Sequence, residues 1–289
     1  MNILLCGASG FVGRHLARAL RDAGYNVIAA VRRPTLATDI AVDFRRDRNK
    51  ATWLPRLAGI DVVVNAVGVL RDSSTNPMQA LHTDTPLALF AACAEAGVRR
   101  VVHLSALGVE SGVAVPYFTT RIVAEQAVSR LPCPALCLRP SVIYGADGAS
   151  AQLFRQLAKL PLHALAMGGE QTLQPVHIDD LGAAVVNWLA TPDAVSLTVA
   201  VVGAEPTTMR GMLDSYRAQL HRRPAYHIAL PRWLVRIMAS LGDYAPNSPL
   251  CSDTFAMLAA GNTADATDFA RLLQRAPRSF RTFIEHESA

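Results

Sequence analysis

Three glycines near the start of the chain restrict most strongly what this sequence can fold into. Gly7 and Gly10 lie between an apolar run at residues 2–6 and a helical pattern at residues 11–23, and Gly13 lies at the start of that pattern. A strand that turns at once into a helix needs residues without Cβ where it turns, where a pyrophosphate approaches and where helix and sheet pack closely. The first N–H groups of such a helix attract phosphates, so we predict a dinucleotide-binding turn, with a turn kept only for packing as the alternative. The residues expected to contact the cofactor there are Gly7, Ser9, Gly10, Phe11, Val12 and Gly13.

The first half of the chain alternates short apolar runs with helical patterns. Strands are expected at residues 2–6, 25–31, 61–66, 100–105 and 135–139, with helices near 11–23, 52–58, 77–96 and 119–131. Alternation of this kind makes a parallel sheet with right-handed crossovers, and continuous apolar strands indicate a sheet covered on both faces. The expected fold class is α/β: a Rossmann doubly wound parallel sheet with helices on both faces and a smaller, mainly helical C-terminal lobe.

After Pro140 the rhythm of the sequence changes. Strands are expected near residues 176 and 198–202, a helix at 180–189, and a mainly helical stretch from residue 207 onward. We therefore predict an NAD(P)-binding Rossmann domain at 1–145 and a substrate-side, mostly helical lobe at 146–289, with the chain crossing back to the sheet. Asp179 or Asp180 is expected to cap the helix at 180–189. No cluster with metal-ligand spacing occurs in the sequence, so no metal site is predicted.

The choice between NAD and NADP is expected at the end of the second strand. An NAD-binding chain places a carboxylate there to accept from the ribose 2′-hydroxyl, but this chain has Arg32 and Arg33. A guanidinium group would bind the 2′-phosphate of NADP in a charge-assisted pair. We expect NADP(H) to be favoured over NAD(H), and two solvated loop arginines are the alternative.

Several motifs resemble a known superfamily. The glycine turn has the spacing Gly-x-x-Gly-x-x-Gly, and residues 138–145 (LRPSVIYG) and 175–180 (PVHIDD) follow in the expected order. The chain resembles the atypical and extended short-chain dehydrogenases/reductases, the NAD(P)-dependent epimerase/dehydratase superfamily. Softer C-terminal matches resemble bacterial relatives of the Rossmann-type accessory subunit of respiratory complex I, over nearly the whole chain. These matches are Leu230–Leu234, Pro249-Leu250, Gly261–Thr263 and Ala276–Arg278, with Gly261 where relatives often carry Asp.

The resemblance implies three catalytic positions. The superfamily uses a Tyr to transfer a proton, a Lys four residues later to bind the nicotinamide ribose and promote proton transfer, and a Ser to polarise the substrate oxygen. Ser105 and Tyr117 stand at the expected places, and Arg121 stands where the lysine is expected. Arg121 shares a helix face with Tyr117 and keeps the charge, but it cannot relay a proton at neutral pH.

The resemblance also implies further cofactor contacts. Asp43 and Phe44 stand where the superfamily's Asp-Leu pair holds the adenine. Ala66, Val67 and Gly68 end the strand beside which the cofactor passes. Pro140 and Val142, together with Tyr117 and Arg121, complete the expected set.

Bulk properties limit the partners and the compartment. The net charge is +5, yet the arginines are scattered and no nucleic-acid-binding motif occurs, so no nucleic acid is expected to bind. Five cysteines without paired spacing, no signal peptide and no apolar run of about 18 residues predict a cytoplasmic protein. Residues 221–241 combine arginines with apolar side chains, which predicts a helical lid over a substrate cleft between domain and lobe. A face for the inner membrane, a quinone or a protein partner is the alternative there, and the oligomeric state stays open.

Three functions agree with these residues. The first is an oxidoreductase that uses NADP(H) on a small carbonyl or quinone-like substrate. The second is a non-catalytic, NADP(H)-retaining structural or redox-sensing subunit, in which the cofactor stabilises the fold. The third is a sugar-nucleotide epimerase or dehydratase.

Overall fold

The computed structural model describes residues 1–245, 248 and 250–285, and Pro249 of the C-terminal motif lies outside them. Contacts divide the chain into two compact units. The first unit comprises Met1–Val109, Pro116–Arg139 and Gly182–Val199, and the second comprises Glu110–Val115, Pro140–Leu181 and Ala200–Ala289.

The large sheet has the strand order of a Rossmann fold. Its strands are β1 (Asn2–Cys6), β2 (Asn26–Val31), β3 (Ile40–Ala41), β4 (Val62–Asn65), β5 (Arg100–Leu104), β6 (Ala135–Pro140) and β11 (Leu197–Val201). They are ordered β11-β6-β5-β4-β1-β2-β3, and the neighbours from β3 to β6 pair in parallel. The strand order reverses between β1 and β4, and in such sheets ligands bind beyond the carboxyl ends of the strands at that point. This sheet confirms the predicted fold class.

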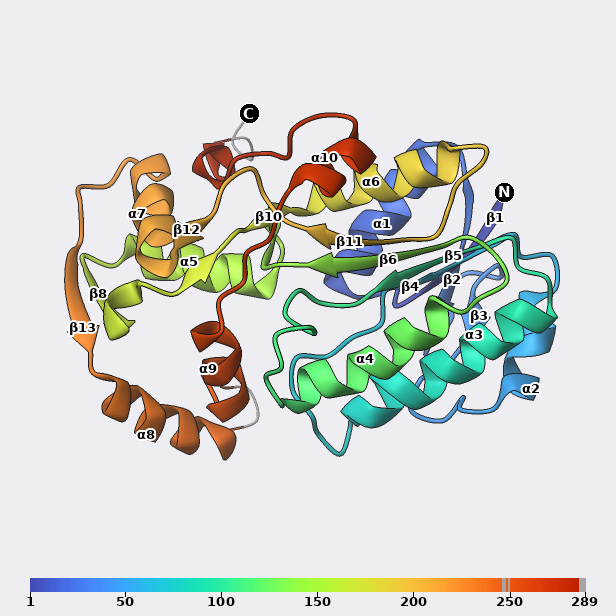
Figure 1. The fold of residues 1–289 in the computed structure, drawn as a ribbon, viewed down its shortest axis with the longest axis horizontal. Coiled ribbons are helices and arrows are strands. Elements are labelled where there is room, and N and C mark those ends of the chain that lie inside the picture. Colours follow the sequence, from blue (N-terminus) through green and yellow to red (C-terminus); the bar gives the residue numbers. More distant parts are fainter. Residues whose placement is uncertain (246–247, 249, 286–289) are drawn as a thin grey trace. The chain divides into compact units, whose positions relative to one another are not determined.

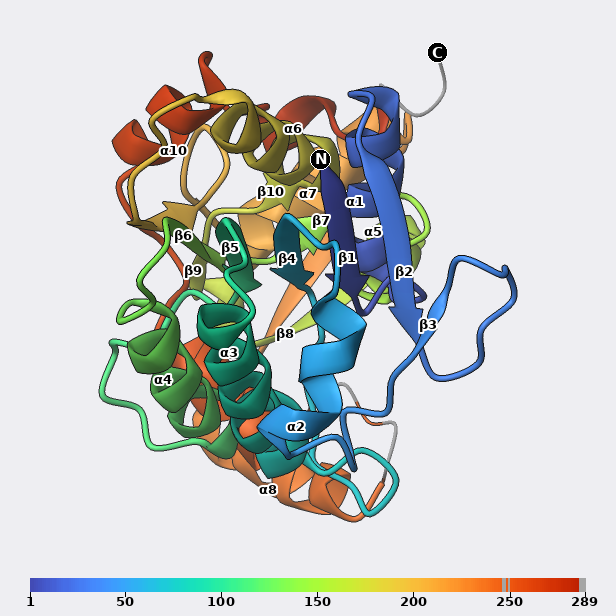
Figure 2. The same cartoon turned by 90° about the vertical axis from the view of Figure 1, so that its right-hand side faces the viewer.

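Helices cover both faces of this sheet, because its strands are apolar on both sides (Figures 1 and 2). One face carries α1 (Phe11–Asp22) and α6 (Ile178–Ala190), and the other carries α2 (Lys50–Trp53), α3 (Thr85–Glu95) and α4 (Pro116–Val128). The two helices of the first face pack closely, since a Cβ built on Gly182 would lie 3.1 Å from the Cβ of Ala19. The core below the second face joins Leu4 and Val63 to Trp53 and Phe90.

Two predicted helices are interrupted at prolines. The helix expected at 52–58 is α2 followed by the 3-10 helix η1 (Leu54–Leu57), which contains Pro55. The helix expected at 77–96 contains a π-helix, η2 (Ala80–Asp84), before α3, and Pro86 lies at the start of α3. A proline lacks the N–H that would bond to the carbonyl four residues earlier, so a regular α-helix cannot continue through either position.

The second unit is rich in helices and also contains short strand pairs. Its helices are α5 (Ala149–Lys159), η3 (Met167–Gly169), α7 (Met209–Gln219), α8 (Arg232–Asp243), α9 (Ser252–Ala259), α10 (Thr267–Leu273) and η4 (Phe280–Thr282). Its strands are β7 (Ile143–Tyr144), β8 (Leu162–Ala166), β9 (Thr172–Leu173), β10 (Val176–His177), β12 (Thr207–Thr208) and β13 (Tyr226–Leu230). The sequence did not predict β8 and β13, which pair in parallel across more than sixty residues of chain. β13 lies within the segment expected as a helix, and each strand is stabilised by pairing with the other, which lies far away in the sequence.

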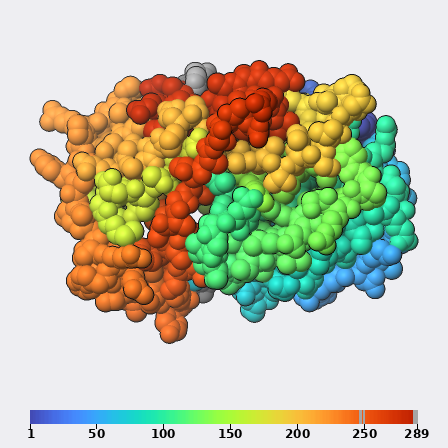
Figure 3. All heavy atoms as spheres, viewed as in Figure 1, coloured from blue at the N-terminus to red at the C-terminus, as the bar shows by residue number. Residues whose placement is uncertain are grey.

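The segment expected as a helix at 221–241 contains β13 instead, and α8 starts only after Pro231. Val235 and Ala239 of α8 are buried, whereas Trp233 and Leu241 are 63% and 66% exposed. In Figure 3, α8 forms part of the orange surface. Among the described helices, none is both long and apolar enough to cross a membrane. The proposed membrane or partner face of this segment stays a prediction.

The predicted cap of α6 is wrong. The side chain of His177 accepts a hydrogen bond from the backbone N of Asp179, at 3.2 Å, and so occupies the capping role. The carboxylate of Asp180 is completely buried and accepts from the Arg275 side chain and, at 2.7 Å, from the backbone N of Arg278. Asp180 therefore anchors the segment after α10, since two donors from that segment compete successfully for its oxygens.

Candidate functional site

The glycine turn has the geometry that a dinucleotide-binding loop requires. Gly7 has a φ of 82°, and a Cβ there would lie 2.9 Å from the carbonyl carbon of Ala66. A Cβ on Gly13 would lie 2.0 Å from the carbonyl oxygen of Gly7, so only glycine lets α1 approach β1 this closely. Among the described residues, no side chain caps α1, and a Cβ on Gly10 would meet only the Gly7 carbonyl oxygen. The first N–H groups of α1 therefore lie at an exposed turn where a phosphate can bind them.

The residues after β4 complete this turn. The backbone N of Ala66 donates to the carbonyl of Cys6 at 3.0 Å, which holds the two strand ends together. The backbone N of Val67 donates to the side chain of the buried Asn65 at 3.2 Å. Gly68 follows at an exposed position. The predicted contacts at 66–68 thus lie beside the glycine turn, at the point where the strand order reverses.

A pocket of about 880 Å³ opens beside the glycine turn, within the first unit. Its lining includes five arginines and two aspartates, namely Arg14, Arg21, Arg32, Arg33, Arg45, Asp39 and Asp43. Ser9 and Val31 also line it, so the pocket extends from the glycine turn to the end of β2. Arg32 and Arg33 are exposed. An excess of guanidinium groups at this place favours an anionic ligand.

Asp43 and Phe44 have different surroundings. The carboxylate of Asp43 accepts two hydrogen bonds from the Arg45 guanidinium, at 2.8 and 2.6 Å, and this partner lowers its pKa to about 2. Phe44 is buried and packs edge-on against Trp53, with the ring centres 5.5 Å apart. Asp43 therefore lies in the arginine-lined pocket, while the side chain of Phe44 belongs to the core. Their contact with an adenine stays a prediction.

Tyr117 and Arg121 lie on one face of α4 and are in contact. The guanidinium carbon of Arg121 is 4.6 Å from the centre of the Tyr117 ring. Arg121 is buried, and its Nη1 donates to the carbonyl oxygen of Leu104, the last residue of β5, at 3.1 Å. A Cβ on Gly68 would lie 2.6 Å from Nη2, so glycine at that position makes room for the arginine. Arg121 thus reaches from α4 to the carboxyl ends of β4 and β5, where the cofactor is expected.

His82 is a site residue that sequence reasoning missed. It comes from the π-helix η2, and its Nε2 accepts from the backbone N of Val69 at 3.0 Å and lies 3.3 Å from Nη2 of Arg121. Its Nδ1 therefore carries the proton and donates to Thr120 at 3.0 Å. Burial and the charge of Arg121 lower the pKa of His82 to about 2, so the ring is neutral. In the sequence, the only indication of this role was that His82 is a single histidine within the apolar helical pattern at 77–96.

We expect acid to destabilise the protein through His82 and through a second buried histidine, His103. Burial lowers the pKa of His103 to about 3. Both histidines bind fewer protons in the folded protein than in the unfolded chain. Their contribution to stability is therefore present above about pH 6.5 and falls by about 1.4 kcal/mol per histidine for each pH unit below it. Urea unfolding at pH 7.5 and 5.5 measures this loss. In His82→Gln, which keeps a donor and an acceptor but does not titrate, the loss should be about 1.4 kcal/mol smaller, and an unchanged loss would contradict the assignment.

The remaining predicted residues are Ser105, which directly follows Leu104 in the first unit, and Pro140 and Val142 in the second unit. Ser105 follows β5 and is buried, and its Oγ has no hydrogen-bond partner in the part of the chain described. An unsatisfied buried hydroxyl at a strand end is available to a ligand oxygen. Pro140 and Val142 belong to the second unit, where the carbonyl of Val142 accepts from Val176 at 3.0 Å. Their contact with the cofactor stays a prediction.

The site residues of the first unit fit a dinucleotide. The cradle at Gly7 and Gly13 would be blocked by any Cβ, and the arginine-lined pocket adjoins it. Together with the strand order, this geometry defines a Rossmann dinucleotide-binding protein. A model of the NAD dependent epimerase/dehydratase family matches residues 3–203, and the chain belongs to that family.

The chain is similar to proteins of several kinds. It is 24% identical to a mitochondrial NADH dehydrogenase [ubiquinone] 1 alpha subcomplex subunit 9 from Rattus norvegicus, over 84% of this chain and 67% of the relative. It is 28% identical to a ceramide reductase from Caulobacter vibrioides, over 66% of this chain and only 61% of that enzyme. The structure of UDP-glucuronic acid 4-epimerase from Bacillus cereus, solved with UDP-glucuronic acid and NAD, aligns with a TM-score of 0.73 at 20% identity, over 99% of this chain and 97% of the epimerase. At that identity, the last likeness is one of fold.

Proposed function

We propose that this protein binds NADP(H) and reduces a small carbonyl or quinone-like substrate. The observation that supports NADP(H) over NAD(H) is the arginine-lined pocket between the glycine turn and the end of β2. A 2′-phosphate is a dianion that guanidinium groups bind by charge-assisted hydrogen bonds. Arg32 and Arg33 make no ion pair with another described residue, so both are available to such a ligand. The similarity to a ceramide reductase supports the reductase part.

The catalytic residues in this proposal are Tyr117, Ser105 and Arg121. The nicotinamide, when bound, supplies the hydride. The Tyr117 hydroxyl donates a proton to the substrate oxygen, and the Ser105 Oγ donates a hydrogen bond to the same oxygen. Arg121 supplies positive charge against the Tyr117 ring and is held there by Leu104 and His82. Because Arg121 is permanently protonated, the proton that returns to Tyr117 must come from water or from a ribose hydroxyl.

The cofactor choice is tested by Arg32→Asp. We expect the variant to bind NADPH about 10- to 100-fold more weakly, because a hydrogen bond to a charged group is worth about 1.5–3 kcal/mol. Its affinity for NADH should not fall, so the preference inverts. The measurement is a titration of both nucleotides followed by fluorescence. Arg18→Asp is the matched control, since Arg18 lies on α1 with its side chain 82% exposed and does not line the pocket. A ratio of NADPH to NADH affinity that is the same in both variants and the parent would remove Arg32 from the proposal.

A structural or redox-sensing role is the second candidate, and the contacts of Arg121 favour it. Its guanidinium is engaged by Leu104 and His82, so it is less free to bind a ribose than a lysine would be. Mass spectrometry of nucleotide released by denaturing the purified protein separates the two roles. Near-stoichiometric NADP(H) would favour a retained, structural cofactor. A protein that emerges empty but is stabilised by added NADPH would favour an enzyme that exchanges its cofactor.

A further inference from the structure

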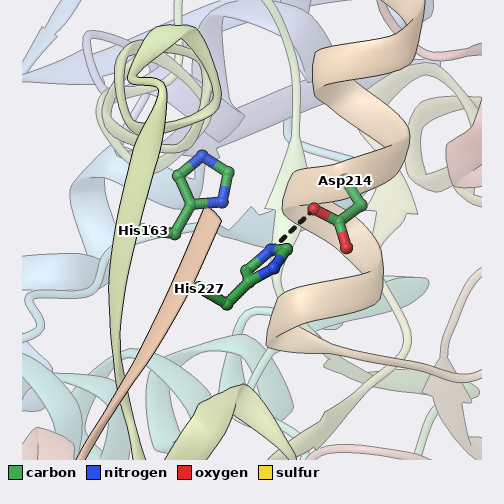
Figure 4. Close-up of side chains that lie close together, drawn as sticks. All are labelled: His163, Asp214 and His227. Atoms are coloured by element: carbon green, nitrogen blue, oxygen red, sulfur yellow. Dashed lines mark hydrogen bonds and ion pairs between the residues drawn. The ribbon is translucent and has the colours of Figure 1, made fainter. Parts of the chain in front are cut away.

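The second unit brings together two histidines and an aspartate that are far apart in the sequence. His163 on β8 and His227 on β13 are register partners in the parallel strand pair, so their side chains leave the same face. Asp214 on α7 lies against that face, and its Oδ1 accepts from Nε2 of His227 at 2.9 Å (Figure 4). One ligand-capable atom from each of the three residues lies within 4.8 Å of the other two.

His163 is the member of this cluster that hydrogen bonding does not explain. Its side chain is only 3% exposed, and neither ring nitrogen forms a hydrogen bond of regular geometry with another described residue, although a backbone group of Leu157 lies close enough to act on the ring. Buried polar atoms are normally satisfied, so two unsatisfied nitrogens on one buried ring call for an unseen partner.

We propose that His163, Asp214 and His227 bind one divalent transition-metal ion, with zinc the best match. Two imidazole nitrogens and one carboxylate oxygen are an established ligand set for zinc, which leaves a fourth position for water or another ligand. Ligand atoms about 2.0–2.1 Å from a tetrahedral ion lie about 3.4 Å apart, so rotation of these side chains must close the widest separation by at most about 1.4 Å. When Nε2 of His227 becomes a metal ligand, its proton moves to Nδ1 of the same ring. The ring therefore stays neutral.

Nearby arginines weaken the site without abolishing it. Asp214 and His227 line a pocket of about 410 Å³ together with Arg210, Arg217 and Arg222, which gives an ion access from solvent. Arg217 donates to the carbonyl of Ala158 at 2.9 Å, but its positive charge still acts on His163. Arg210 competes for Asp214, because its Nε lies 3.9 Å from Oδ2. We therefore expect Arg210→Gln to bind the metal more tightly than the parent protein.

The ion would join β8, β13 and α7, in addition to the backbone pairing of β8 with β13 and the hydrogen bond between His227 and Asp214 of α7. None of the residues assigned to the dinucleotide site is a ligand in this metal site. The metal proposal is therefore independent of the proposed reductase function. This site was not predicted from the sequence, because His163 and Asp214 lie 51 positions apart along the chain.

The test is zinc binding by the full chain. Protein stripped with a chelator and titrated with Zn²⁺ in a calorimeter should bind one ion per chain, and Co²⁺ in its place should give the intense visible absorption of a tetrahedral site. Asp214→Asn, in which a half-exposed side chain keeps its shape, should lose at least about 100-fold in affinity, because even outer-shell partners of a metal site are worth about 10- to 100-fold. His163→Gln should lose a similar factor.

Controls keep the test decisive. His15→Gln removes a histidine of the first unit and should leave zinc affinity unchanged. Thermal melts in chelator show whether each variant folds, and Zn²⁺ should raise the melting temperature of the parent but not of Asp214→Asn. Equal zinc binding by the parent and Asp214→Asn, or the same loss in His15→Gln, would overturn the proposal. Absence of binding to the folded parent would do the same and would assign the orphaned nitrogens of His163 to a buried water.

Discussion

Tyr117→Phe is expected to lower the turnover of NADPH by about 10²- to 10⁴-fold, because a positioned proton donor typically contributes that much. The variant keeps the ring that stacks against Arg121, so only the hydroxyl is lost. Its affinity for NADPH should change by no more than a few-fold, which separates a loss of chemistry from a loss of binding. The measurement is NADPH oxidation under saturating cofactor, with a quinone or an aromatic diketone as the carbonyl probe.

Tyr226→Phe is the matched control for this experiment. Tyr226 lies in the second unit, on β13, and is 80% exposed, so loss of its hydroxyl should leave turnover unchanged. A Tyr117→Phe enzyme with the parent rate would remove Tyr117 as the proton donor. If the parent itself oxidises no NADPH with any probe while holding the nucleotide, the structural role of the cofactor is the one that remains.

Asp180→Ala should lower the free energy of unfolding by about 3 kcal/mol, the lower end of the about 3–5 kcal/mol typical for breaking a buried ion pair. The carboxylate is completely buried, and its removal leaves the backbone N of Arg278 without its acceptor. The lower end applies because Arg275 and Arg278 are partly exposed, with 43% and 36% of their side-chain surface accessible, and regain solvation. Urea unfolding at neutral pH measures the change.

Asp179→Ala provides the comparison from the same helix turn. The Asp179 side chain is 53% exposed and pairs with Arg278 at 2.8 Å, as a surface ion pair worth at most about 1 kcal/mol. The difference between the two neighbouring variants therefore isolates the effect of burial. Equal destabilisation by both would show that the Asp180 contacts do not anchor the C-terminal segment.

The glycine turn shows how much of the site could be predicted from sequence. The strand at residues 2–6 and the start of the helix at residue 11 agree with the structure, as does the close approach at Gly13. Each depends on residues within a few positions of one another, so the pattern of apolar residues and glycines already contains the information. The position of Arg32 and Arg33 at the end of the second strand could be predicted in the same way, because both residues directly follow β2.

Other parts of the site depend on residues that only folding brings together. Arg121 meets His82 across 39 residues, and His163 meets His227 across a strand pair whose members lie more than sixty residues apart in the sequence. The cap of α6 was predicted from its local sequence and assigned to the wrong side chain, because the donors that bind Asp180 lie more than ninety residues away. Local sequence thus accounts for the Rossmann turn and the cofactor loop, where backbone conformation and periodicity decide. Tertiary structure alone decides which buried polar groups become partners, because each must find a hydrogen bond or a countercharge wherever the chain provides one.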